Sequence, residues 1–448
     1  MSKIVLKNAT ALTDSGFRQT EILIEGDTIA RIEPSINEKA DREIDCTGQL
    51  VLPGLIDAHV HFRQPGLEHK GTIATESVAA ALGGVTSYME MPNTSPSTTT
   101  VEALHDKKAI AARDSMVNYA FYLGAGENNL EEVKRVDPHE IAGIKIYMGS
   151  TTGNLLLDDD SALYKMFEAS PALVATHCED NGIINANTAR AKEMYGDDIP
   201  FEMHPVIRNR DCCLKSSKLA IEAALATRKR LHIMHLSSAE EVAMMAQFAH
   251  GPLHERQISA EVCIPHMFFN DSDYQRLKGF LKCNPAVKFE RDRQALLKGL
   301  RTGVISTVGT DHAPHELAVK KSDKYLNVAS GLPSVQFSLN VIFELARRRE
   351  ISLEEGIKAA TINVAERFGI EKRGAIKEGW FADIAIIDPR VHYTVTQDDI
   401  ASLCKWSPML GESFSCMVTH TIASGNLVVA DSRICSEPGK AMALRFNH

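Results

Sequence analysis

The stretch that decides the fold is Gly54-Leu55-Ile56-Asp57-Ala58-His59-Val60-His61, in which an apolar run passes into alternating histidines. Its pattern predicts a β-strand, and side chains two positions apart on a strand share a face. His59, His61 and the nearby Arg63 should therefore point to the same side. An isolated pair of this kind is more often a half-exposed strand end than a binding site. Its place in the fold decides between the two.

Seven more stretches of strand character follow, and helical patterns lie between them. Residues 73–82 have a helical pattern that Gly83-Gly84 should end, and residues 216–227 have an apolar face at helical spacing. Eight βα units close into a barrel, so the sequence predicts an α/β fold with a (β/α)8 barrel of the TIM type. The strands are expected at residues 54–61, 85–91, 117–123, 143–148, 173–177, 231–236, 258–263 and 304–309.

The two ends of the chain resemble each other and differ from the barrel. Residues 21–32 and 421–430 each have the pattern of a β-hairpin with glycine at the turn, and residues 382–387 add a strand. We expect one small β-sandwich domain built from residues 1–52 and 375–448. The barrel, residues 53–374, is then inserted between its halves.

Composition favours small-molecule chemistry. The chain of 448 residues has 58 acidic against 49 basic side chains, and this net charge of −9 argues against nucleic acid or an anionic membrane as partner. No stretch has the apolar length of a signal peptide or a membrane span, so we expect a cytoplasmic protein. The nine cysteines show no disulfide or zinc-knuckle spacing and are expected to be reduced.

Ligand-type side chains lie at several other predicted strand ends. Lys145 lies in the fourth strand, His177 ends the fifth, His235 ends the sixth, and Asp311 follows the eighth. Active sites of such barrels lie at this end of the strands, so chance is a poor explanation for the set. Imidazole and carboxylate ligands suit zinc, and their number suggests two ions with a bridging group.

Lys145 is the residue of the fourth strand placed to supply that bridge. An ammonium group cannot ligate a cation. A lysine of lowered pKa can add carbon dioxide, however, and the carbamate oxygens can then bridge two ions. The alternative is an ordinary lysine in a structural ion pair.

Three motifs carry a family resemblance: residues 53–66 (PGLIDAHVHFRQPG), residues 91–94 (MPNT) and residues 310–315 (TDHAPH). They resemble the signatures of the dihydroorotase family in the amidohydrolase superfamily, and the similarity covers essentially the whole chain. The resemblance implies two zinc ions per chain, bridged by N6-carboxylysine. By this resemblance the first ion is bound by His59, His61 and Asp311, the second by His177 and His235, and the bridge is Lys145. Some bacterial relatives use an aspartate as the bridge, so Asp158, Asp159 and Asp160 stay an alternative.

The same resemblance implies how a substrate is held. Arg63 and Asn93 are expected to bind the carboxylate of dihydroorotate, while Asn284, His315 and the backbone of Gly331 line the ring pocket. Lys288 stands where many relatives have arginine, which weakens a role for it. The loop at residues 149–154 is a candidate lid.

We therefore expect a dihydroorotase, which interconverts dihydroorotate and N-carbamoyl-L-aspartate in pyrimidine biosynthesis. Asp311 would accept a proton from the attacking water and return it to the departing ring nitrogen. The nearest rivals are a hydantoinase, dihydropyrimidinase or allantoinase, which generally lack an arginine like Arg63. Another is a non-catalytic scaffold for aspartate transcarbamoylase, which would typically lack metal ligands. A homodimer is expected, and assembly with aspartate transcarbamoylase is left open.

Overall fold

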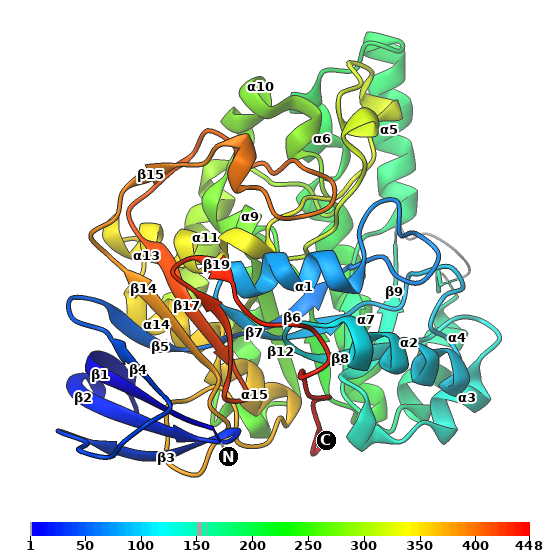
Figure 1. Ribbon diagram of the computed structural model, residues 1–448. Coiled ribbons are helices and arrows are strands. Elements are labelled where there is room, and N and C mark those ends of the chain that lie inside the picture. The colour runs from blue at the N-terminus through cyan, green and yellow to red at the C-terminus, as the bar shows by residue number, and fades with distance from the viewer. Residues whose placement is uncertain (1, 150–154, 158) are drawn as a thin grey trace.

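Eight parallel strands form the central sheet of the protein and follow one another in chain order around a barrel. The computed structural model describes residues 2–149, 155–157 and 159–448. Figure 1 shows the barrel strands at the centre with helices outside them. The strands are β6 (Leu55–Val60), β7 (Val85–Glu90), β8 (Asn118–Gly124), β9 (Gly143–Tyr147), β10 (Val174–His177), β11 (Leu231–Ile233), β12 (Ile258–Cys263) and β13 (Thr307–Gly309).

The barrel closes between its first strand and its last. The backbone N–H of His61 donates to the carbonyl of His312 at 2.7 Å, and Val60 and His312 form a parallel bridge. The predicted barrel is confirmed, and no predicted strand end differs from the observed one by more than three residues. The largest differences occur at β11 and β13, which pair with β12 over three residues each.

The helices between the strands begin and end where local hydrogen bonds allow. Helix α1 matches its prediction, because Thr72 caps the first turn and Gly83 follows the last. Helix α7 starts earlier than predicted, since the side chain of Asn209 accepts from the N–H of Cys212 at 3.1 Å. The helices are α1 (Ile73–Leu82), α2 (Val101–Asp114), α3 (Leu130–Arg135), α4 (Asp160–Ala169), α5 (Asn181–Tyr195), α6 (His204–Ile207), α7 (Arg210–Thr227), α8 (Ala239–Met245), α9 (Ile264–Phe268), α10 (Tyr274–Leu277), α11 (Glu290–Arg301), α12 (Leu317–Lys320), α13 (Ser338–Arg347), α14 (Leu353–Ala359) and α15 (Ile362–Phe368).

Both ends of the chain form one β domain beside the barrel. In Figure 1 the blue N-terminal strands and the orange and red C-terminal strands lie on the same side. They meet where β5 pairs antiparallel with β14, and apolar side chains of both halves share one core. The limits 1–52 and 375–448 stay a prediction. The strands of this nine-stranded sheet are β1 (Lys3–Thr13), β2 (Gly16–Glu25), β3 (Thr28–Glu33), β4 (Arg42–Asp45), β5 (Leu50–Pro53), β14 (Ile384–Asp388), β17 (Met417–Ala423), β18 (Asn426–Ala430) and β19 (Arg433–Ile434), and a separate pair is β15 (Tyr393–Thr394) with β16 (Ser413–Phe414).

The barrel interior is apolar below the mouth. Met89, Tyr122 and Met234 pack inside it, and Phe368 of α15 and Phe446 of the C-terminal segment belong to the same cluster. Polar side chains therefore gather at the opposite end, where the strands finish.

Two further expectations concern the whole chain. Within the described part of the chain, no helix combines the length and the apolar character that crossing a membrane would require. All nine cysteines are free.

Candidate active site

The predicted ligand and substrate residues meet in one cavity at the carboxyl end of the barrel strands. Its volume is about 370 Å³, and all eleven predicted site residues line it. The metal-type residues come from the ends of five strands: His59, His61, Lys145, His177, His235 and Asp311. The predicted substrate residues in the same lining are Arg63, Asn93, Asn284, His315 and Gly331.

Asp311 lies against both histidines of the first barrel strand. Its Oδ1 is 3.2 Å from Nε2 of His59 and 3.0 Å from Nε2 of His61. The other ring nitrogens face away from Asp311. Nδ1 of His59 lies 2.8 Å from Glu261, and Nδ1 of His61 lies 2.7 Å from Oδ1 of Asn93. A proton on each outward nitrogen leaves the inward lone pairs for an ion, which is how metal-binding histidines are usually oriented.

His177 and His235 provide a second pair of nitrogens. Nδ1 of His177 and Nε2 of His235 are 2.9 Å apart, and both residues are buried. Nε2 of His177 lies 2.9 Å from Glu179, whose carboxylate also pairs with Arg208. Because Nε2 is used in this way, Nδ1 is the nitrogen of His177 that could hold an ion together with His235.

Lys145 is buried beside these histidines, and the described residues offer its amine no carboxylate in ion-pair contact. Its Nζ lies 3.0 Å from the sulfur of Met234 and 4.8 Å from the centre of the Tyr147 ring. Burial lowers the pKa of Lys145 to about 8. The neutral amine, which is the form that adds carbon dioxide, is therefore more populated here than in an exposed lysine.

The aspartate alternative to Lys145 receives no support from the two aspartates that the structure describes. Asp159 caps α4 by accepting from the N–H of Ala162, and Asp160 is the first residue of that helix. Neither residue lines the cavity that holds the histidines. Asp158 and residues 150–154 of the candidate lid lie outside the described residues.

The carboxylates of Asp311 and Glu261 place negative charge on two sides of His59. Burial by itself lowers the pKa of His59, but Asp311 and Glu261 together raise it to about 9. Burial by itself raises the pKa of Asp311, yet His59 and His61 hold it well below its usual range. A positive charge between two carboxylates is thus favoured here, and a divalent cation bound to these nitrogens and oxygens fits that requirement.

Three of the predicted site residues have a backbone conformation that non-glycine residues rarely adopt. The angle φ is 75° at Arg63, 40° at His235 and 48° at Asp311. Backbone strain of this kind is concentrated at functional sites, where surrounding structure holds it in place.

Arg63 is buried at the mouth beside His315. Its Nε donates to the carbonyl of Pro314 at 3.1 Å, and its Nη2 lies 3.2 Å from Nε2 of His315. The same nitrogen of His315 lies 3.0 Å from the carbonyl of Ser330. Among the described residues no carboxylate forms an ion pair with Arg63, so its guanidinium is available to bind an anionic ligand.

Asn284 and Gly331 form part of the wall around the ring pocket. Oδ1 of Asn284 is buried, and the described residues provide it with no hydrogen-bond donor. The N–H of Gly331 is already used, because it donates to the carbonyl of Lys282 at 2.9 Å. Only the Gly331 carbonyl is left for a ligand, and it also accepts from Lys320 at 3.1 Å. Glycine is required here, since a Cβ would lie 2.6 Å from the carbonyl oxygen of Ala313 and 2.9 Å from the ring of His315.

Lys288 does not line the cavity, in agreement with the weak role expected for it. The side chain is buried outside the cavity, where its Nζ donates to the hydroxyl of Ser237 at 2.8 Å.

Comparison with known proteins identifies the family of the chain. Residues 50–428 match the amidohydrolase family. The chain belongs to this family. The amidohydrolase is 29% identical to a dihydroorotase of Methanosarcina acetivorans, over 98% of this chain and 95% of the relative. It is 30% identical to an allantoinase of Bacillus velezensis, over 96% of this chain and 94% of the relative.

A solved structure shows the same architecture. The L-hydantoinase (dihydropyrimidinase) of Arthrobacter aurescens matches the amidohydrolase with a TM-score of 0.93 and 25% identity, over 99% of this chain and 100% of the other. The proteins that this chain resembles differ in the activities for which they are named.

Four residues of the amidohydrolase site were not identified from the sequence. Lys70 and Tyr147 line the cavity, while Glu179 and Glu261 orient the histidines from behind. Lys70 follows the first motif closely, and Tyr147 lies two residues after Lys145, so strand periodicity could have indicated the latter. Glu261 carries no such signal, because its partner His59 is distant in the chain.

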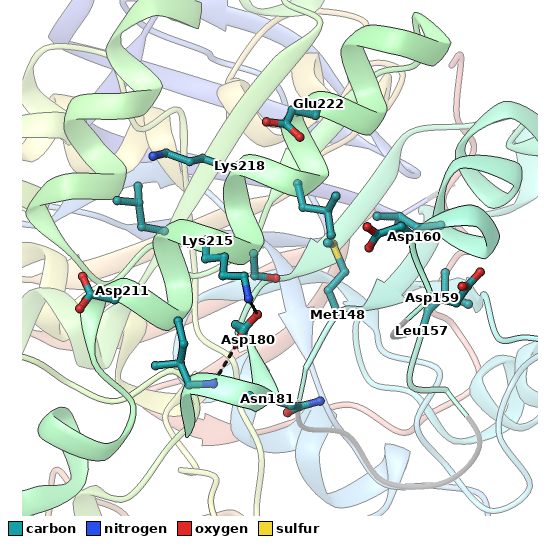
Figure 2. Close-up of a pocket in the computed structure, with 16 residues that line it drawn as sticks. Met148, Leu157, Asp159, Asp160, Asp180, Asn181, Asp211, Lys215, Lys218 and Glu222 are labelled. Carbon is teal, nitrogen blue, oxygen red and sulfur yellow. Dashed lines mark hydrogen bonds and ion pairs between the residues drawn. The ribbon is translucent and has the colours of Figure 1, made fainter. Parts of the chain in front are cut away.

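A second hollow, of about 820 Å³, lies between α4, α5 and α7. Figure 2 shows its charged lining, in which Lys215 pairs with Asp180 at 2.6 Å. The described residues around it include neither histidine nor cysteine, and of the residues considered from the sequence only the alternative bridge candidates Asp159 and Asp160 line it. The smaller cavity at the barrel mouth is therefore the candidate active site of the amidohydrolase.

Proposed function

We propose that this amidohydrolase hydrolyses cyclic amides and that its reaction is the interconversion of dihydroorotate and N-carbamoyl-L-aspartate, the dihydroorotase reaction of pyrimidine biosynthesis. The observation that carries the proposal is Arg63, a buried guanidinium at the mouth of the cavity that holds the metal-type ligands. Dihydroorotate has a ring carboxylate, which dihydrouracil, hydantoin and allantoin lack.

Because Arg63 is buried, its positive charge indicates what kind of ligand the cavity binds. A buried charge without a partner is costly, and here burial also lowers the pKa of the guanidinium. A carboxylate offers two acceptor oxygens to the guanidinium fork and balances its charge. Lys70 lines the same cavity and adds a second positive group. The site therefore suits an anionic cyclic amide better than a neutral one.

The donor set fits two divalent ions. His59, His61 and Asp311 would hold one, His177 and His235 the other, with Lys145 as the carbamate bridge. Zinc is the ion we propose, because these nitrogen and oxygen ligands suit it. When bound, such ions lower the pKa of water and polarise a carbonyl group.

Asp311 is placed to move the proton. It is held as a carboxylate at the centre of the ligand group, so it can accept a proton from the attacking water. Hydrolysis breaks the bond between the ring carbonyl carbon and the ring nitrogen. Asp311 then returns the proton to that nitrogen, and the carbonyl carbon ends as a carboxylic acid, which releases its remaining proton to solvent as it ionises to the carboxylate.

The ring pocket supplies the remaining recognition. The unpartnered Oδ1 of Asn284 can accept a ring N–H of the substrate. His315 is neutral at working pH, because burial, Arg63 and Lys320 lower its pKa to about 2. It can therefore contact the ring without adding charge.

Turnover by the purified protein with dihydroorotate, hydantoin, dihydrouracil and allantoin tests the proposal. Dihydroorotate should be the preferred substrate by a wide margin in kcat/KM. The allantoinase and hydantoinase relatives favour the second candidate, a cyclic amidase for neutral rings. Preference for any of the three neutral substrates would establish that candidate instead.

The remaining expectations are untested and stay part of the proposal. They are a homodimer and a cytoplasmic location, and assembly with aspartate transcarbamoylase stays open. A non-catalytic scaffold is disfavoured, because six metal-type residues line one cavity.

A further inference from the structure

Tyr147 is a cavity residue to which the reaction described above gives no task. It ends β9 two residues after Lys145 and is 4% exposed. In the parallel ladder it pairs with His177 of β10, so the two side chains lie on the same face of the sheet. Both line the cavity at the barrel mouth. The ring lies in the wall of the active-site cavity together with Arg63 and Asn93.

The hydroxyl of Tyr147 is buried and has no hydrogen-bond partner among the described residues. Leaving such a group unsatisfied costs free energy, and native proteins rarely do so without a reason. A tyrosine that only filled space would need no hydroxyl. The unpaired hydroxyl therefore points to a ligand group that completes it.

Arg63 indicates which group that is. The guanidinium of Arg63 and the side chain of Tyr147 line the same cavity. A guanidinium has no acceptor atom, so the hydroxyl cannot donate to it. Both groups instead offer donors to the cavity, and a ligand that only accepts hydrogen bonds fits two such donors. An ionised carboxylate is a ligand of this kind.

We propose that the Tyr147 hydroxyl donates a hydrogen bond to the substrate carboxylate that Arg63 binds. The inference rests on the proposed function, because it assigns a second donor to the same carboxylate. It makes Tyr147 a specificity-determining residue, since cyclic amides without a carboxylate do not use the hydroxyl.

Tyr147→Phe removes the hydroxyl and leaves the ring, so the fold is not at risk. The variant should raise KM for dihydroorotate, and Kd for orotate, by on the order of tenfold or more, as expected for a hydrogen bond to a charged group. Orotate is a probe that carries the carboxylate but has no reduced ring to open, and calorimetry measures its Kd without turnover. Any turnover of dihydrouracil should change by less than twofold.

Tyr88→Phe is the matched control. The Tyr88 hydroxyl is also buried, but it interacts with the side chain of Ser115, and Tyr88 does not line the cavity. This variant should match the wild type in every constant. If Tyr147→Phe bound orotate within twofold of the wild type, the proposal would be wrong, and a loss confined to kcat would also overturn it. A wild-type protein that neither hydrolyses dihydroorotate nor binds orotate would contradict the proposed function itself, and the role of Tyr147 would fall with it.

Discussion

The amide oxygen of Asn93 lies 2.7 Å from Nδ1 of His61. This contact fixes the tautomer of His61, since Nδ1 must carry the proton and Nε2 then faces Asp311. It also fixes the amide of Asn93, because an oxygen that accepts from His61 leaves the NH₂ group to face the cavity. One side chain thus orients a proposed metal ligand and offers two donors to the cavity.

Asn93→Asp separates these two roles. The carboxylate can still accept from Nδ1 of His61, so metal content should stay at the wild-type level. It cannot donate, and its charge repels a substrate carboxylate. We expect KM for dihydroorotate to rise by at least about tenfold, from the loss of a charged hydrogen bond. Asn93→Ala should lose bound zinc as well, which elemental analysis would detect. An Asn93→Asp variant with wild-type KM would contradict this account.

Lys145 gives a pH dependence for carbamate formation. Its pKa of about 8 means that the neutral amine is scarce at pH 6.5 and predominant at pH 8.5. The neutral fraction rises roughly 25-fold between these values for a group of that pKa. At constant dissolved ¹³CO₂ and excess zinc, incorporation of label, followed by ¹³C NMR, should accelerate in the same direction. Lys145→Ala is the control and should take up no label at any pH. Equal rates at both pH values would argue against Lys145 as the bridge.

Asp311→Asn tests the proton transfer. The amide keeps an oxygen for the ion but cannot accept a proton, and loss of general acid–base catalysis costs on the order of 10²–10⁴-fold in rate. We expect kcat to fall by this amount while orotate still binds. A variant with its zinc in place and kcat within a few-fold of the wild type would remove Asp311 from the mechanism.

Lys320 supports the wall of the ring pocket from behind. It is buried, and its Nζ donates to the carbonyls of Ala329 at 2.8 Å, Gly331 at 3.1 Å and Lys282 at 3.2 Å. Burial lowers its pKa to about 7. The residues that it contacts include Gly331, where a Cβ would lie 2.9 Å from the ring of His315.

Lys320→Met should therefore loosen this wall without touching the metal ligands. We expect KM for dihydroorotate to rise several-fold, with zinc content unchanged and the melting temperature lowered by the buried carbonyls that lose their donor. The adjacent Lys321 is exposed, so Lys321→Met is a matched control and should behave as the wild type. If both variants had the same KM, Lys320 would have no part in shaping the pocket.

The barrel, and the meeting of its ligand-type residues in one cavity, could be predicted because both follow local patterns. The strand pattern around His59 recurs along the chain, and a barrel brings the carboxyl ends of all strands together, so His177 and Asp311 needed no long-range information. The contacts behind the ligands could not be predicted in this way. Glu261 meets His59 across 202 positions of the chain, and such a pairing depends on packing that no local pattern records.

The backbone role expected for Gly331 shows a second limit. The sequence indicates that the residue belongs to the pocket, and the structure places it there. Its N–H, however, donates to the carbonyl of Lys282, and glycine is needed because a Cβ would lie 2.6 Å from the carbonyl oxygen of Ala313 and 2.9 Å from the ring of His315. A resemblance between sequences locates a residue but does not say which of its atoms are already paired.

Arg63 is the residue on which the choice of substrate depends. If its guanidinium holds the dihydroorotate carboxylate through two charged hydrogen bonds, each worth about 1.5–3 kcal/mol, Arg63→Met should lower kcat/KM for dihydroorotate by at least tens of fold. Arg63→Lys should rescue only part of the loss, because a point charge cannot reproduce the planar fork. Neutral cyclic amides do not use the fork and should lose far less. The ratio of the two losses is the measurement, taken with dihydroorotate and dihydrouracil on the same preparation. Equal losses would mean that Arg63 is structural, through its contacts with Pro314 and His315, and would move the protein to the amidases of neutral rings.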